Sequence, residues 1–552
     1  MRIKLFLPIF LIIVLLFPSC QKESPSNQNR VIVGISADPE SLNPLFVLSF
    51  EEVNISDQLF LGLVTQKWND SLGIVESAPM LAKNWNWNKD STSITINLRK
   101  DVSWSDGKPV TVKDVIFSLD MYSDPDVQSR LYGTFENFYV DKNQHVIIDK
   151  TFEVLSPYKF IIKLNKKTAP SLFNIDFPII PEHVYKGINR KNLVTEEKNI
   201  KLVTDGAFTL SSWNKNQAII LKTNKESFLY RPGNISELIF KIIPDYNSRL
   251  LQLKNGEVDI IDHIRSQDVE AIKNDSKLEL KSIKGREYEY AGWNNIDPSA
   301  YREDQKIIPN KLFGSAKVRE ALSYAINKEE ILNGYLNGYG DVAVGPVAPI
   351  FKSAIDTSLK PLSYNPEKAQ KILSEEGWKD VNNNGVLEKG NQEFSFILDI
   401  PAGNLRRRFA ASIIKNNLKA IGIDVKIETL EFGVYNDKMY GHELNAWIGG
   451  WVVPIPITLR PFWYSELTKT PLNVIGYQNK AVDLLLNKIE KTGLQSKKNE
   501  LVKKFQNILY KDNPVTFLYL IDDLVAYNNR IKNIEINPLG YLHHCWNWSF
   551  KD

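Results

Sequence analysis

The chain has 552 residues, of which 43% are hydrophobic and 24% are charged, and its formal net charge is +3. Acidic and basic residues are interspersed without a basic block, which excludes the charge pattern of a nucleic-acid-binding protein. The length exceeds what one hydrophobic core normally holds, so it predicts two or three domains.

The N-terminus has the layout of an export signal followed by a polar tether. Two basic residues precede the apolar run Leu5–Phe17, which is shorter than the about 20 residues that a membrane span needs. A small residue and then Cys20 follow, which resembles a lipobox. We expect a signal peptide over 1–19, lipidation of the Cys20 thiol and a lipidated tether over 20–30. The alternative is an ordinary signal peptide with an incidental cysteine.

The stretch 78–119 predicts a strand, a turn and a helix. Apolar and polar side chains alternate over 93–99, as in a strand with one buried face. The sequence at 106–109 is DGKP, which is typical of a turn. Thr111 and Asp114 have the spacing of a capping box and predict the start of a helix.

The second half of the chain is more helical. An apolar stripe predicts a helix over 317–336. Asn365 is expected to cap a second helix, whose first residue is Pro366. The segments 394–400, 405–421 and 423–427 read as strand, helix and strand. Such a unit usually builds a parallel pair with a right-handed crossover.

The sequence of 78–119 resembles that of solute-binding protein family 5, the peptide/nickel-type receptors of bacterial ABC importers. In that family the phrase runs roughly as LA..W....D.....F.LR..V.WSDG.PVTA.DV.FS, and nearly every fixed position is met here in order. The motif Asp38-Pro39 near the start and the segment 256–259 (GEVD) also match the family. The resemblance covers almost all of the chain after the tether.

This resemblance implies an α/β chain with a two-lobed periplasmic-binding-protein-like fold and an extra α+β subdomain on lobe I. The expected boundaries are 31–287 for lobe I, about 56–199 for its accessory subdomain, 288–515 for lobe II and 516–552 for a return segment of lobe I. A hinge is expected near 288–294 and 515–519, with the solute enclosed as the lobes close.

The resemblance also indicates where the solute binds. Peptide-binding members carry the phrase G-W-x-x-D, whose aspartate pairs with the ammonium of the peptide N-terminus. Trp451 matches the tryptophan, but Pro454 stands at the aspartate position, and no acid occurs between Glu443 and Glu466. Either another group anchors the amine or the ligand is not a free peptide.

Four residues are candidates for ligand binding. Trp451 is expected to form a pocket wall, and Trp463 is a second aromatic candidate; the alternative for both is core packing. Asn294 is expected to hydrogen-bond ligand backbone, or else to be a satisfied turn amide. Arg407, one of three adjacent arginines, is expected to hold a ligand carboxylate, or else to lie in a solvated helix start.

No metal site and no cofactor are expected. The segment 380–385 resembles the start of a calcium loop, but Asn391 replaces the bidentate glutamate, so a plain turn is preferred. His543-His544-Cys545 is assigned a structural role, because adjacent residues rarely ligate one ion together. The chain has no G-x-S-x-G, Walker A or H-E-x-x-H motif, and we expect it not to be an enzyme.

The resemblance implies an extracytoplasmic substrate-binding lipoprotein of an ABC importer, in the periplasm or at the cell surface. It would be a lipid-anchored monomer without a nucleic-acid partner. It would capture an oligopeptide or peptide-like solute and deliver it to a permease that separate ATPase subunits drive. One alternative is the same scaffold binding a glycan or a metal chelate. Another is a secreted lipoprotein hydrolase, which needs a nucleophile beside a base in a cleft.

Overall fold

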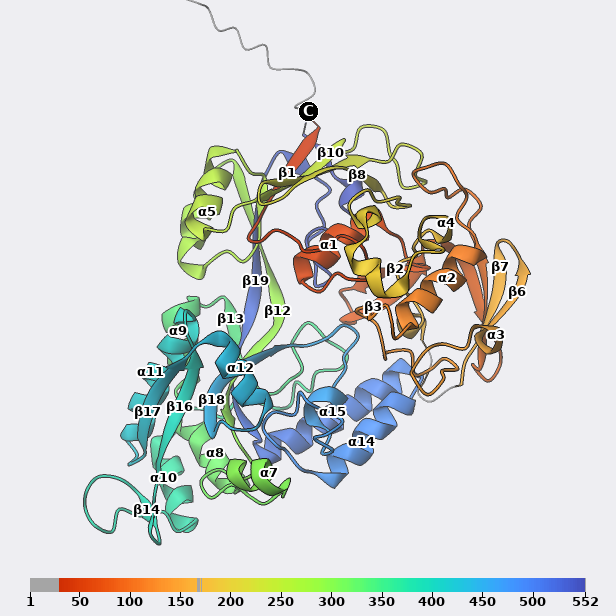
Figure 1. Cartoon of the computed structure of the whole chain (residues 1–552). Helices are drawn as coiled ribbons and strands as arrows, with labels where there is room; N and C mark the ends of the chain where they lie inside the picture. The colour runs from red at the N-terminus through yellow and green to blue at the C-terminus, as the bar shows by residue number, and fades with distance from the viewer. Residues whose placement is uncertain (1–28, 166–168, 170, 552) are drawn as a thin grey trace, which may run out of the picture.

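The computed structural model describes residues 29–165, 169 and 171–551 (Figure 1). The expected signal peptide and Cys20 lie outside the described residues. Two lobes are joined by two long antiparallel strands, β12 (Leu278–Trp293) and β19 (Val515–Asn528). The expected two-lobed α/β fold is confirmed. The first strand begins at Arg30, within the expected tether.

One sheet of eleven strands runs through both lobes. Its order is β17-β16-β18-β12-β19-β11-β1-β10-β9-β8, and β13 pairs with β19 at the side. The lobe I strands are β1 (Arg30–Ile35), β8 (Phe208–Asn214), β9 (Ala218–Thr223), β10 (Glu237–Ile242) and β11 (Ile260–Ile261). The lobe II strands are β13 (Gly340–Val342), β16 (Ser395–Pro401), β17 (Asp424–Leu430) and β18 (Ala446–Val452).

The strand directions bring loops from both lobes to the space between them. The strands β1, β10 and β11 are parallel, and they run in the same direction as β12, toward lobe II. The strands β16, β17 and β18 are parallel and run the opposite way, toward lobe I. Ligands of open α/β sheets bind outside the carboxyl ends of the strands. The inter-lobe space is therefore the place where this fold positions a ligand.

The crossing strands change partners at an irregular point. Residues 278–283 of β12 pair with β19 alone, whereas 287–292 pair with β19 on one side and with β18 on the other. The register shifts between Ile283 and Glu287, where the partners change, and again between Glu289 and Tyr290. A Cβ atom on Gly285 would lie 1.7 Å from the carbonyl oxygen of Ile521, so only glycine fits there.

The accessory region has a separate small sheet with the order β4-β5-β7-β6 and a hairpin of β2 and β3. These strands are β2 (Val64–Asn69), β3 (Ile74–Pro79), β4 (Ala82–Trp87), β5 (Ser93–Leu98), β6 (Phe152–Ser156) and β7 (Lys159–Lys163). The predicted strand 93–99 is β5. The capping box is confirmed, because the Thr111 backbone N–H donates to Asp114 Oδ2 at 2.8 Å. This region and lobe I share one continuous core.

Helices cover the sheets. Those of lobe I and its accessory region are α1 (Phe50–Leu59), α2 (Val112–Ser123), α3 (Ile148–Thr151), α4 (Glu182–Tyr185), α5 (Tyr246–Asn255) and α6 (Val269–Lys273). Those of lobe II are α7 (Pro298–Asp304), α8 (Ala316–Ala325), α9 (Lys328–Leu336), α10 (Pro366–Glu375), α11 (Leu405–Lys419), α12 (Phe432–Tyr440), α13 (Arg460–Trp463), α14 (Lys480–Lys491) and α15 (Gln495–Asp512). Four two-residue strands complete the structure: β14 (Glu388–Lys389), β15 (Gln392–Glu393), β20 (Ile531–Lys532) and β21 (Ser549–Phe550).

Two predictions for lobe II differ in outcome. The parallel unit is confirmed as β16, α11 and β17. The single helix predicted over 317–336 is wrong, because α8 ends at Ala325 and α9 begins at Lys328. Asn327 causes the break: its side chain accepts the Glu330 backbone N–H at 3.1 Å and caps a new helix.

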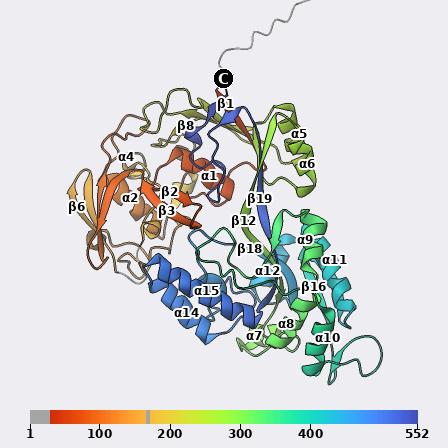
Figure 2. The ribbon, with the colours of Figure 1, turned by 180° about the vertical axis from the view of Figure 1, so that it is seen from behind.

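The lobes also touch away from the crossing strands. The turn between β2 and β3 reaches lobe II, where Lys352 Nζ lies 2.9 Å from Asp70 Oδ2 and the Ser353 N–H donates to the Leu72 carbonyl. On the other side of the crossing strands, Ser266 Oγ donates to the Tyr335 carbonyl at 2.8 Å. Figure 2 shows α1, β2 and β3 on the side of lobe I that is nearest to lobe II. Within the described ranges, no helix combines the length and the hydropathy that a membrane crossing requires.

Candidate solute-binding site

Arg407 lies at the crossing strands, paired with a buried acid. Its Nε donates to Glu289 Oε1 at 2.8 Å, and Arg406 Nη2 lies 2.9 Å from the same oxygen. Tyr519 donates its hydroxyl proton to the other oxygen of Glu289. Burial alone would raise the pKa of Glu289, but the two arginine charges outweigh it and lower the pKa. The arginine predicted to hold a ligand carboxylate therefore holds a carboxylate of the protein.

Asn294 and Trp463 lie in the interior. The Asn294 side chain is fully buried, and its Nδ2 donates to the carbonyls of His442 and Leu444 at 3.2 and 2.9 Å. Trp463 is 4% exposed and packs against Phe505 among other aromatic rings. These contacts match the structural alternatives. Ligand contact by either residue stays a prediction.

Trp451 lies at the end of β18 and is only partly buried. Its ring centroid is 5.2 Å from that of Phe462 and 6.4 Å from that of Tyr440, which is 43% exposed. Val452, the next residue, is 52% exposed. An aromatic group with free surface at the carboxyl end of a gap-facing strand fits the predicted pocket wall. Pro454 follows closely and offers no charge.

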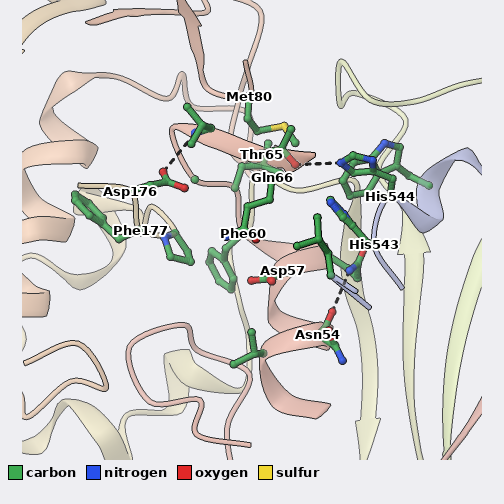
Figure 3. Close-up of a pocket in the computed structure, with 18 of the residues that line it drawn as sticks. Asn54, Asp57, Phe60, Thr65, Gln66, Met80, Asp176, Phe177, His543 and His544 are labelled. Carbon is green, nitrogen blue, oxygen red and sulfur yellow. Dashed lines mark hydrogen bonds between the residues drawn. The ribbon is translucent and has the colours of Figure 1, made fainter. Parts of the chain in front are cut away.

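A cavity of about 370 Å³ opens in lobe I (Figure 3). We call it the lobe I cavity. Its walls come from α1, the strand β2, the segment 176–178 and the C-terminal loop that carries His543 and His544. The polar groups at the wall include Asn54, Asp57, Thr65, Gln66, Arg130 and Asp176. The apolar part includes Phe50, Phe60, Leu61, Met80 and Phe177.

Two carboxylates of the lobe I cavity are unusually basic. Burial raises the pKa of Asp57 to about 6, and the charge of Arg130 opposes this effect. Burial raises the pKa of Asp176 to about 7, with a further rise from the Asp57 charge, although Asp176 Oδ1 accepts the Leu63 N–H at 2.7 Å. Protein atoms surround Asp57, but its side chain is exposed, and this exposed surface faces the cavity.

Sequence reasoning missed both carboxylates. Asp57 belongs to α1 and Asp176 to a loop after the accessory sheet, and the two meet only through the tertiary fold. Neither belongs to a motif with local spacing. The one sequence signal was indirect: the absence of an acid near Pro454 means that a ligand amine would need a carboxylate elsewhere.

A second cavity, of about 880 Å³, lies between the lobes beside the crossing strands. Its walls include the loop 263–267 of lobe I, the loop 401–404 of lobe II and charged side chains of the crossing strands, among them Glu287 and Asp523. Burial raises the pKa of Asp523, and the positive charge of His263 opposes this effect.

The two patterns weighed as metal ligands make hydrogen bonds within the protein. Asp380 accepts the backbone N–H groups of Asn384 and Gly385 at 3.1 and 3.0 Å, as in a plain turn. Cys545 is buried and its thiol donates to Gln58 Oε1, while His544 Nε2 lies 3.0 Å from Thr65 Oγ1. The described ranges contain no cluster of three or more histidine, cysteine or acidic side chains suited to a metal ion.

The fold and the site define a class of protein: a two-lobed receptor that places loops, an aromatic wall and cavities around the space between its lobes. The sequence model of a protein family, the bacterial extracellular solute-binding proteins, family 5 middle, matches residues 76–470. The chain belongs to this family, whose members are transport binding proteins and not enzymes.

Several relatives span nearly the whole chain. The oligopeptide-binding protein AppA of Bacillus subtilis is 26% identical over 95% of this chain and 92% of its own length. Heme-binding protein A of Haemophilus influenzae is 27% identical over 95% and 93%. The structure of Bacillus subtilis AppA in complex with a nonapeptide matches 96% of this chain and all of the AppA chain, with a TM-score of 0.74 and 25% identity.

Proposed function

We propose that the chain captures an oligopeptide or a peptide-like solute between its lobes and delivers it to a membrane permease driven by separate ATPase subunits. The observation that carries this proposal is the match to an oligopeptide-binding protein over 95% of the chain. The place of Trp451 near the end of β18 that points toward lobe I supports it, because pocket walls are commonly aromatic. The receptor acts as a monomer.

We propose the expected division of the chain, with lobe I over 31–287 and 516–552 and lobe II over 288–515. We propose a hinge at 284–286, just before 288–294, which is one of the two hinge segments expected from sequence, the other being 515–519. This placement rests on the register shift of β12 and on Gly285, because a break in strand pairing is where a ladder bends.

The N-terminal pattern supports a lipid anchor at Cys20, with the two lobes outside the cytoplasm. Replacing Cys20 by serine is expected to move the protein from the membrane fraction to the soluble fraction and to abolish labelling by palmitate. Retention in the membrane with unchanged labelling would exclude this anchor.

Mass spectrometry of solute co-purified with the full chain tests the proposed function. Peptides released on denaturation are expected, and their amount should fall in a Trp451→Ala variant. Recovery of a glycan or a metal chelate without peptides would overturn the proposed solute. That outcome would agree with Pro454 in place of the amine-binding aspartate, and with the variety of relatives, which include a heme-binding protein.

A further inference from the structure

We propose that the lobe I cavity is a subsite for an alkyl cation of the solute, meaning an aliphatic stem that ends in an ammonium or guanidinium group. A lysine or arginine side chain of a peptide has this chemistry. The inference rests on the proposed function and deepens it, because it assigns a chemical class to one part of the solute.

The charges of the cavity wall favour a cation. The Asp57 carboxylate makes no hydrogen bond to the described part of the chain, and it points into the cavity. Asp176 contributes a second carboxylate, and Arg130 is the one arginine among the described residues that line the wall. Burial lowers the pKa of His543 to about 3 and also lowers that of His544, so both imidazoles are neutral near pH 7. With both carboxylates ionised the wall has an excess negative charge, which a bound cation neutralises.

The apolar part of the wall favours an aliphatic stem. Long cationic side chains lay their methylene groups along apolar surface and keep the charged end in polar surroundings. The lobe I cavity offers both parts, with Phe60 and Phe177 beside the two carboxylates and Met80 near Thr65. Its volume of about 370 Å³ lies at the low end for ligand pockets, so it suits one side chain better than a whole oligopeptide.

The cavity lies where a solute between the lobes can reach it. Phe50, the first residue of α1, lines the cavity and is 49% exposed, and Leu48 just before it is 80% exposed. Thr65 and Gln66 of β2 also line it, and the turn that follows β2 contacts lobe II. A solute enclosed by the lobes would therefore have its main chain beside Trp451 and a cationic side chain in lobe I.

The lobe I carboxylates would supply the negative charge that is absent at Pro454. The aspartate that the family resemblance places at this position belongs to lobe II and pairs with the terminal ammonium of a peptide. Here the carboxylates belong to lobe I, and they lie at the end of a cavity with room for a stem. The chain would select solutes by a basic side chain.

Binding of defined peptides to the full chain tests the inference. The probes are alanine peptides of three, five and nine residues with one central lysine, and the same peptides with norleucine in place of lysine. A third set is the lysine peptides with an acetylated N-terminus. Binding is measured by calorimetry at pH 8. We expect norleucine to weaken binding on the order of 10-fold or more, because it removes a charge-assisted hydrogen bond. N-acetylation should have little effect.

The variant Asp57→Asn should lose the preference for lysine but bind norleucine peptides as the unmodified chain does, which also shows that it is folded. Asp523→Asn, which removes an acid from the second cavity, is the matched control and should keep the preference. Equal binding of lysine and norleucine peptides, or a loss caused by N-acetylation alone, would overturn the inference and leave the proposed function intact. Failure of all the peptides to bind would overturn both.

Discussion

The Nε atom of Arg407 lies 2.8 Å from Oε1 of Glu289, and this contact places the arginine on one face of the central sheet. Side chains alternate along β12, so Tyr288 and Tyr290 project from the opposite face, where they join the core that Trp451 packs against. Arg407 and Trp451 were both predicted to contact the solute. The structure separates them by the sheet and leaves Trp451 with free surface.

The pairing of Glu289 predicts its effect on stability. Glu289→Gln removes the charge that compensates two largely buried guanidinium groups, and breaking such a buried pair typically costs about 3–5 kcal/mol. We expect a loss of this size in the free energy of unfolding, measured with urea.

Glu287→Gln is the control for that variant. Glu287 also contacts Arg406, at 2.8 Å, but its side chain is 37% exposed, so the change should cost less than about 1 kcal/mol. Equal losses in the two variants would show that burial of Glu289 does not set the energetics of the cluster.

The two tryptophans are expected to respond differently to truncation. Trp463→Ala removes a side chain from the core of lobe II and should lower the free energy of unfolding by about 3–5 kcal/mol. Trp451→Ala should destabilise less and should weaken peptide binding on the order of 10-fold, because it removes a partly exposed aromatic wall. Thermal unfolding and calorimetry on both variants separate the roles, and a reversed pattern would contradict them.

Asn294 is expected to act on stability alone. Asn294→Ala leaves the buried carbonyls of His442 and Leu444 without their donor, which should cost about 1–3 kcal/mol. Solute affinity of the folded variant should stay unchanged. A weaker affinity at unchanged stability would instead support the ligand contact predicted from sequence.

Sequence reasoning predicted the elements whose signals lie within a few neighbouring residues. The strand β5 and the start of α2 follow from alternation and a capping box, which operate within four residues. The prediction of one helix over 317–336 was wrong at Asn327. The apolar stripe continues across the break between α8 and α9, and Asn327 caps α9.

The site was harder to predict because its contacts are long-range. The partner of Arg407 is 118 residues away in the chain, and one acceptor of Asn294 is 150 residues away. No local pattern indicates that a basic or amide side chain is already satisfied by such a partner. The motif around Trp451 predicts one wall of the site, at the end of β18, whereas the carboxylates of lobe I required the tertiary fold.

The crossing strands predict a strict requirement for glycine at position 285. Gly285→Ala places a Cβ atom 1.7 Å from the Ile521 carbonyl oxygen, so β12 and β19 must separate locally. We expect a loss of about 3 kcal/mol in the free energy of unfolding and a change in the rate of solute-induced closure, measured by stopped-flow fluorescence. Gly345→Ala, where the added Cβ meets no atom within 4 Å, is the control and should leave both unchanged.

The raised pKa of Asp57 predicts how pH changes the effect of Asp57→Asn. Burial raises the pKa of Asp57 from 3.8 to about 6, so between these values the folded chain binds a proton that the unfolded chain releases. Stability from this group is therefore present below pH 3.8 and is lost as pH rises toward 6. Asparagine has no such dependence. In urea unfolding without solute, the variant should gain stability relative to the unmodified chain between pH 4 and about 6, and the difference should then stay constant.

Asp245→Asn is the control for this pH series, and its stability relative to the unmodified chain should change in the opposite direction. The hydrogen bond from Ser248 lowers the pKa of Asp245, so its contribution is present above pH 3.8 and is lost as pH falls below that value. The asparagine variant should therefore lose stability, relative to the unmodified chain, as pH rises through this range. A difference between Asp57→Asn and the unmodified chain that did not change with pH would show that the Asp57 carboxylate is well solvated, and would remove the electrostatic reason for cation binding in the lobe I cavity.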